Sequence, residues 1–87
     1  MADYEVVLAK SARKELERLP DKIADRIVVQ LEKLQKTPRP SGSLKLQGAR
    51  LWRVRIGDYR VIYEIDDAKK VVDVLVIQHR KDVYRGL

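Results

Sequence analysis

The sequence predicts an α+β fold of order β-α-α-β-β-β, in which a helical hairpin packs on one face of a curved, mainly antiparallel sheet. Two observations predict it: two helix-patterned segments follow a short N-terminal strand, and the second half of the chain carries three strand-patterned segments. Helices grouped apart from most of the strands are typical of α+β folds. The chain has 87 residues and no cysteine, so we expect one domain over residues 1–87 that folds without disulfides.

The first half of the chain supplies the predicted opening strand and both helices. Residues 4–9 are rich in β-branched side chains, which favour a strand. Ser11 is the expected N-cap of a first helix, which Pro20 ends. Apolar side chains then recur at helical spacing as far as Lys36, which predicts an amphipathic helix with one buried face. That face comprises Ile23, Ala24, Ile27, Val28, Leu31 and Leu34.

The second half supplies a loop, a β-hairpin and a last strand. Residues 37–48 contain two prolines and two glycines, which indicates a loop. Residues 51–65 form a hairpin pattern about Gly57 and Asp58, a pair typical of two-residue turns. Residues 70–78 carry apolar side chains on both faces, as in a central strand covered at least partly on both sides. The apolar face of the hairpin, expected in the core, comprises Trp52, Val54, Ile56, Tyr59, Val61, Tyr63 and Ile65.

The other face of the hairpin concentrates positive charge. The two-residue turn places Arg55 directly across from Arg60, with Arg53 on the same face. Like charges that face each other across two strands destabilise the pair, so an anionic partner is expected. The net charge of +6 favours nucleic acid as that partner. In the alternative interpretation the arginines pair with acidic residues of the chain, namely Asp58, Glu64, Asp73 and Asp82.

The segment after the last strand adds polar side chains of a similar kind. His79, Arg80, Lys81 and Tyr84 converge with the arginines if the last strand lies beside the hairpin. Guanidinium groups bind phosphate oxygens through two parallel hydrogen bonds, and a tyrosine can stack on a base. This combination suits a phosphodiester. Taken alone, His79 is equally well explained as a packed or surface histidine, and Tyr84 as a buried anchor for the C-terminal segment.

Several other classes of protein are disfavoured by the sequence. One histidine and no cysteine make a zinc site improbable, and neither GxxxxGK[ST] nor GxGxxG is present. No apolar run approaches the roughly 20 residues that a membrane-spanning helix needs. The first residues lack the layout of a secretion signal. We therefore expect a cytoplasmic protein with no membrane partner.

Two stretches resemble a known family. They are "LKLQGARLWRVRIGDYRVIYEI" and, after a valine-rich strand, "HRKDVY". With the order of elements over nearly the whole chain, they closely resemble the RelE/ParE superfamily of toxins from toxin–antitoxin systems. The resemblance implies a toxin that inhibits translation as a ribosome-dependent, metal-independent endoribonuclease, cutting mRNA in the ribosomal A site without a cofactor. It also implies a cognate antitoxin as partner, which we expect to be acidic.

The resemblance also implies roles for individual residues. The expected catalytic residues are Arg53, Arg55, Arg60, Arg80 and Tyr84, and the expected RNA-binding residues are Lys45, His79 and Lys81. In the implied reaction a 2′-hydroxyl attacks its neighbouring phosphate, leaving a cyclic phosphate and a 5′-hydroxyl. The arginines would stabilise the charge on the pentacoordinate phosphate.

The chain departs from the family pattern at one chemically important place. Lysines often occupy the positions held here by Arg53 and Arg55. An arginine is effectively never deprotonated, so neither residue is expected to act as a general base. Lys45, His79 or a group of the substrate or ribosomal RNA would take that role, or proton removal is only weakly assisted.

Two other functions are compatible with the same fold. A ParE-like poison of DNA gyrase would bind a protein and do no RNA chemistry, and such members generally lack the full basic and tyrosine set. A degenerate, non-toxic member would bind only its antitoxin. The presence of all four arginines with Tyr84 favours the nuclease.

Overall fold

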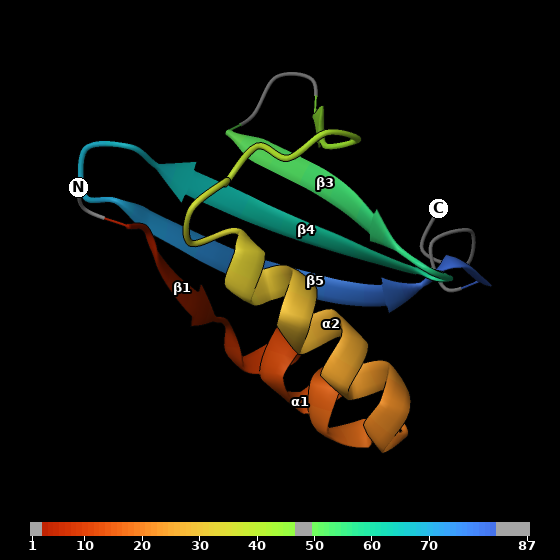
Figure 1. The fold of residues 1–87 in the computed structure, drawn as a ribbon. Coiled ribbons are helices and arrows are strands. Elements are labelled where there is room, and N and C mark those ends of the chain that lie inside the picture. The colour runs from red at the N-terminus through yellow and green to blue at the C-terminus, as the bar shows by residue number, and fades with distance from the viewer. Residues whose placement is uncertain (1–2, 47–49, 82–87) are drawn as a thin grey trace.

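The computed structural model describes residues 3–46 and 50–81, and its two helices cover one face of a five-stranded sheet (Figure 1). The elements are β1 (Glu5–Leu8), α1 (Lys10–Arg18), α2 (Asp21–Lys33), β2 (Leu44–Lys45), β3 (Leu51–Ile56), β4 (Tyr59–Asp66) and β5 (Val71–His79). The predicted α+β fold is confirmed, with β2 as an additional short strand inside the predicted loop. Neither described helix is long and apolar enough to cross a membrane.

The sheet is mixed, with the strand order β1-β5-β4-β3-β2. β1 runs parallel to β5, and the other neighbouring pairs are antiparallel. The last strand therefore lies in the interior of the sheet between the first strand and the hairpin, as its valine-rich sequence indicated. This arrangement carries the end of β5 to the turn between β3 and β4.

A β-bulge in β5 explains the apolar residues on both faces of this strand. Ile62 pairs with Val76 and Tyr63 pairs with Val74, so Leu75 is an extra residue without a partner in β4. The extra residue switches the alternation, and residues 72, 74 and 77 therefore all point into the core. The bulge, and not cover on both faces of the strand as predicted, accounts for the pattern.

The bulge is also where the first helix meets the sheet. The Ser11 hydroxyl donates a hydrogen bond of 2.9 Å to the carbonyl of Leu75, and the Ala9 N–H donates one of 2.8 Å to the carbonyl of Val74. The predicted N-cap is therefore wrong: α1 begins at Lys10, and Ala9 is its N-cap without a side-chain hydrogen bond. The serine hydroxyl is engaged in a contact between distant segments instead.

The core lies between the helices and the sheet. Its largest fully buried side chain is that of Tyr63, and Ile27 of α2 and Ala12 of α1 belong to the same cluster. All of the hairpin residues predicted for the core lie in it or pack against it. Among the described residues no polar or charged side chain is classed as buried with it. The buried residues are Ala12, Ile27, Leu31, Leu34, Ile56, Val61, Tyr63, Ile65, Val72, Val74 and Ile77.

The loop after α2 is fastened to the sheet by polar contacts around Arg39. Its guanidinium lies 5.2 Å from the ring centre of Trp52 and forms an ion pair of 2.7 Å with Asp67. The Tyr4 hydroxyl donates a hydrogen bond of 2.6 Å to the same carboxylate. The Tyr63 hydroxyl donates one of 2.8 Å to the carbonyl of Pro38. These contacts sit at the end of β4 farthest from the hairpin turn.

The Asp67 contacts predict a specific dependence of stability on pH. Hydrogen bonds from Arg39 and then Tyr4 lower the pKa of Asp67 below its ordinary value. A lowered folded-state pKa contributes stability above the unfolded value and loses it as the pH falls below about 4. The difference in melting temperature between the unmodified protein and Asp67→Asn should therefore shrink as the pH falls from neutral through this range.

Asp25→Asn, an exposed change on α2, serves as the control, and its difference should not follow the same curve. A constant difference for Asp67→Asn at all pH values would show that the carboxylate charge contributes nothing.

Candidate nucleic-acid interface

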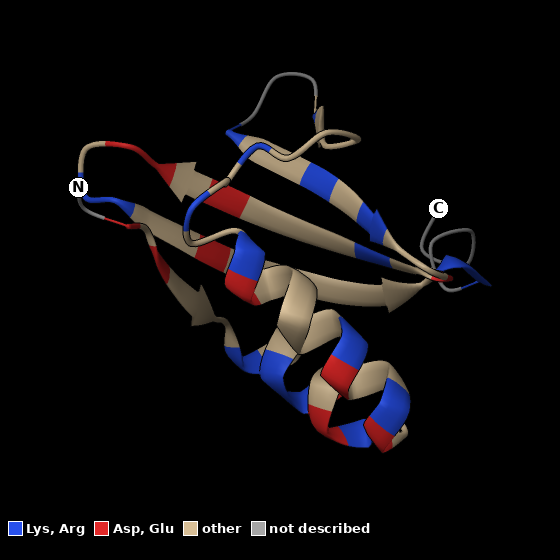
Figure 2. Ribbon diagram, in the orientation of Figure 1, with Lys and Arg blue, Asp and Glu red and all other residues tan. Residues whose placement is uncertain are grey.

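The predicted facing pair of arginines is present on the open face of the sheet. In the β3–β4 register Arg55 pairs with Arg60, and Arg53 pairs with Ile62. Side chains alternate across each strand, and the inward positions are taken by Val54, Ile56 and Val61. The arginines therefore point away from the helices, as predicted. Figure 2 shows their positive charge along β3 and at the start of β4.

The end of β5 brings two more cations to this pair. Arg60 pairs with Gln78, and beyond His79 the chain leaves the sheet at Arg80 and Lys81. The backbone N–H of Arg80 donates a hydrogen bond of 2.8 Å to the carbonyl of Asp58 in the hairpin turn. A pocket of about 360 Å³ results, lined by Arg55, Arg60, Arg80 and Lys81, which we call the basic pocket. The basic segments that the sequence placed apart are thus brought together.

The hairpin turn holds the basic pocket in shape. Gly57 has φ of +60°, a conformation that side chains other than glycine rarely adopt. Its carbonyl accepts a hydrogen bond of 3.0 Å from Nε of Arg55, and the next carbonyl, of Asp58, accepts the one from Arg80. Among the described residues only Nε of Arg55 is engaged in this way, so its terminal amino groups can still donate to an anion.

The acidic residues of the open face do not neutralise the basic pocket. Glu64 pairs with Asp73 across β4 and β5, four residues along the strand from Arg60, or about 13 Å. Within residues 3–46 and 50–81 the pocket cations form no ion pair, and the ion pair found there joins Arg39 and Asp67. Figure 2 shows basic residues at the turn end of the sheet and acidic residues of β4 and β5 towards the other end, where further basic residues also lie. Asp58 is exposed beside the pocket, and Asp82 lies outside the described residues.

The other predicted site residues take separate positions. Arg53 shares the open face but does not line the basic pocket. Lys45 pairs with Trp52, so it belongs to the helix-covered side at the edge of the sheet. The ring of His79 meets that of Tyr59 edge-on at 5.1 Å, and its Nδ1 accepts a hydrogen bond of 3.2 Å from the backbone of Lys81. The predicted catalytic residue Tyr84 lies outside the described residues.

Comparison with known proteins identifies the family. Residues 6–84 match the family described as the ParE toxin of the type II toxin–antitoxin system parDE. The chain belongs to the RelE/ParE family of toxins. The predicted membership is thus confirmed, and the match covers most of the fold described above, the basic pocket included.

Individual members of the RelE/ParE family match this toxin along most of their length. Toxin RelG of Mycobacterium tuberculosis is 34% identical over 84 residues, which are 94% of this chain and 97% of that protein. Toxin RelE of the same organism is 37% identical over 84 residues, which are 94% and 87% of the two chains. The archaeal RelE of the RelE–RelB complex from Pyrococcus horikoshii OT3 superposes with a TM-score of 0.82 at 33% identity, covering 90% of this chain and 96% of that one.

One arginine of the toxin lies at the hairpin turn without having been predicted there. Arg26 belongs to the charged side of α2, which the helical pattern assigns to solvent. In the structure its Nη1 lies 3.3 Å from the position that a Cβ on Gly57 would take. Helical periodicity gives the face of the helix on which a residue lies but not the loop that this face meets, so no signal in the sequence indicated this contact.

The turn geometry predicts the effect of a substitution at Gly57. Gly57→Ala should lower the free energy of unfolding by about 1–2 kcal/mol, because an alanine is strained at positive φ. The added Cβ would also press on Arg26. Urea denaturation measures the change.

Asn tolerates positive φ better than Ala does, so Gly57→Asn should cost less than Gly57→Ala despite its larger side chain. Equal stability of the alanine variant and the unmodified protein would contradict the role given to this turn.

Proposed function

We propose that this toxin is an endoribonuclease that cleaves mRNA on the ribosome and thereby inhibits translation. The observation that carries the proposal is the basic pocket, in which Arg55 and Arg60 face each other without an acidic partner among the described residues. Facing like charges destabilise a sheet, so their presence is best explained by an anionic ligand. A phosphodiester of RNA supplies the negative charge that the pocket lacks.

The arginines would act on the phosphate and not on the attacking hydroxyl. In the proposed reaction the bond from the 2′-oxygen to phosphorus forms, and the bond from phosphorus to the 5′-oxygen breaks. Charge builds up on the two remaining phosphate oxygens, where guanidinium groups donate hydrogen bonds and stabilise it. Arg55, Arg60 and Arg80 surround the space where such a phosphate would sit. The products are a 2′,3′-cyclic phosphate and a 5′-hydroxyl.

Proton transfer needs other groups, because arginine stays protonated. The 2′-hydroxyl must lose a proton, and the leaving 5′-oxygen must gain one. Lys45 belongs to the other side of the sheet, which disfavours it for either step. His79 lies at the end of β5 next to the pocket cations Arg80 and Lys81. Its Nδ1 accepts a backbone hydrogen bond, so Nε2 is the ring nitrogen left to act as a donor, and His79 is the better placed protein candidate for protonating the leaving 5′-oxygen.

The proposed partners are the ribosome with its A-site mRNA and a cognate antitoxin. A related toxin from Pyrococcus horikoshii was solved as a RelE–RelB complex. By analogy, an antitoxin would bind this chain, and acidic side chains on it would neutralise the basic pocket. Such charge complementarity sets partner choice and speeds association more than it adds affinity.

A second candidate function has support from one observation. The matching family is described by its ParE member, and a ParE-like toxin would act on DNA gyrase through protein contacts. The two candidates predict different products. A nuclease leaves cut mRNA on ribosomes, whereas a gyrase poison leaves mRNA intact and blocks DNA supercoiling.

The deciding experiment maps mRNA ends after brief induction and measures gyrase supercoiling with the purified toxin. We expect new 5′-hydroxyl ends inside coding regions, dependent on ribosomes, and gyrase activity equal to that without toxin. Intact mRNA together with inhibited gyrase would overturn the proposal in favour of the second candidate.

The proposal predicts that Arg60→Ala separates activity from stability. Loss of one donor to a transition-state oxyanion typically costs about 2.7–4 kcal/mol, so cleavage should fall about a hundred- to a thousand-fold. The melting temperature should be unchanged or slightly higher, because removal of Arg60 relieves its repulsion with Arg55. Cleavage of mRNA on programmed ribosomes and a thermal melt measure the two effects.

Arg13→Ala is the matched control, since it removes an exposed arginine from α1 on the other face of the sheet. If Arg60→Ala melts lower and cuts normally per folded molecule, Arg60 is a structural residue.

A further inference from the structure

A second pocket lies on the helix side of the β3–β4 turn. Its volume is about 240 Å³, and it is lined by Arg26, the turn residues Gly57 and Asp58, Tyr59 and three isoleucines, Ile23, Ile27 and Ile56. We call it the turn pocket. It shares no lining residue with the basic pocket, yet only the two-residue turn separates them.

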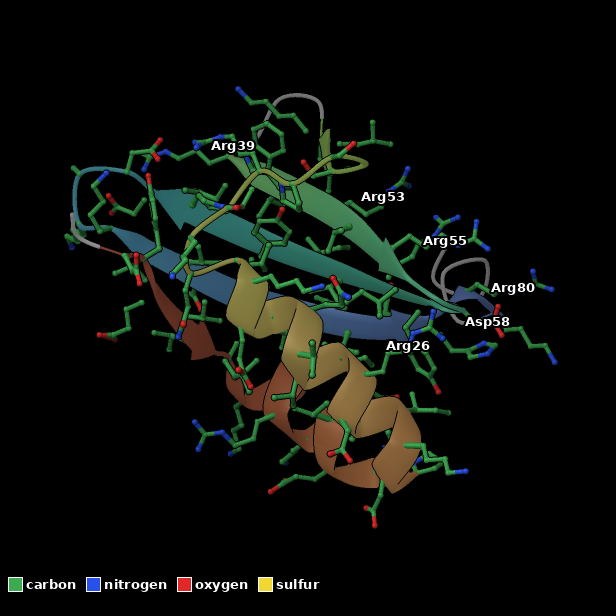
Figure 3. All side chains as sticks on the ribbon, in the orientation of Figure 1. Arg26, Arg39, Arg53, Arg55, Asp58 and Arg80 are labelled. Atoms are coloured by element: carbon green, nitrogen blue, oxygen red, sulfur yellow. The ribbon has the colours of Figure 1, made fainter. Side chains whose placement is uncertain are left out.

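The turn connects the two pockets through direct contacts. On the open side, the Gly57 carbonyl accepts a hydrogen bond from Arg55, and the Asp58 carbonyl accepts one from the backbone of Arg80. On the helix side, the guanidinium of Arg26 packs on Gly57. Figure 3 shows Arg26, Arg55 and Arg80 gathered with Asp58 at this end of the sheet.

The positive charge of Arg26 has no ion-pair partner among the described residues. It is exposed on α2, and no carboxylate of residues 3–46 and 50–81 lies within ion-pair distance of it. Its neighbour Asp58 is also exposed, and it makes no ion pair with Arg26. The guanidinium thus lies beside the turn, and the side chain that carries it is exposed to solvent.

The turn pocket has the chemistry of a nucleotide site. Its arginine can bind phosphate, and its tyrosine and isoleucines offer an apolar lining to a base. Single-stranded nucleic acids are bound by this combination of positive charge along the backbone and aromatic rings beside the bases.

We propose that RNA bound in the basic pocket crosses the β3–β4 turn, that Arg26 binds a phosphate of a neighbouring nucleotide, and that the turn pocket receives its base. The inference rests on the proposed function, because it extends the RNA path from that site. It makes Arg26 a substrate-binding residue. The competing role for Arg26 is mechanical support of the turn, with no contact to RNA.

The salt dependence of RNA binding distinguishes these roles. Each phosphate contact to a single strand contributes about 0.7 to the slope of log K against log salt concentration. The dissociation constant of a short single-stranded RNA with 2′-O-methyl groups, which block cleavage, is measured by fluorescence anisotropy from about 50 to 200 mM salt. The proteins compared are the unmodified toxin, Arg26→Gln, Arg26→Lys and Lys33→Gln.

Lys33→Gln is the matched control, since it removes one exposed charge from the same helix about 10 Å farther along its axis. We expect Arg26→Gln to lower the slope by about 0.7, with Arg26→Lys and Lys33→Gln close to the unmodified toxin. Lysine keeps the charge but not the planar group that packs on Gly57, so retention of the slope excludes a purely mechanical role. Thermal melts verify that each variant is folded.

Two results would overturn the inference alone. One is a slope for Arg26→Gln equal to that for Lys33→Gln, and the other is an equal loss of slope in Arg26→Gln and Arg26→Lys. Either result leaves the nuclease proposal standing if Arg60→Ala still lowers cleavage as predicted above. Failure of the unmodified toxin both to bind RNA and to cleave mRNA would overturn the two proposals together.

Discussion

The two-residue turn at Gly57 and Asp58 is the constraint on which the site depends. Because the turn has this length, Arg55 meets Arg60 across the strands, and the arginines and the apolar residues fall on opposite faces. A shift of one residue would move the arginines into the core and the core residues into solvent. The same turn supplies the carbonyls that hold Arg55 and the start of the segment after β5. The turn therefore determines both the β3–β4 register and the geometry of the basic pocket.

Among the described residues, an arginine is paired with a carboxylate at one end of the sheet, whereas the arginines at the other end are not. At the far end, Arg39 is paired with Asp67 and packed on Trp52, and the contacts fasten a loop to the strands. At the turn end, the cations lie close together and are not neutralised by the described part of the chain. Exposed ion pairs add little stability, and exposed like charges remove little. The buried core provides most of the stability of the fold, so both arrangements are compatible with it.

The features that the sequence predicted correctly are local. The apolar stripe of α2 and the alternation about Gly57 and Asp58 each arise within a few residues, and they gave the helix and the arginine register. The features that it missed depend on segments far apart. The hydroxyl of Ser11 bonds a carbonyl 64 positions away, and the contact of Arg26 with the turn joins a helix to a hairpin. The bulge at Leu75 is visible in the sequence as apolar residues of both parities, but at least partial cover on both faces explained that pattern equally well.

The parallel pairing of β1 with β5 has a consequence for how the protein is made. Among the described strands β1 pairs only with β5, so it stays unpaired until residues 71–74 have been synthesised. Pairing between such distant segments is slow, because a long loop must close before any contact forms. The helices can form early, whereas the basic pocket needs Arg80 to reach Asp58. The basic pocket is therefore among the last of the described parts of the molecule to assemble, because two of its four lining residues, Arg80 and Lys81, follow β5.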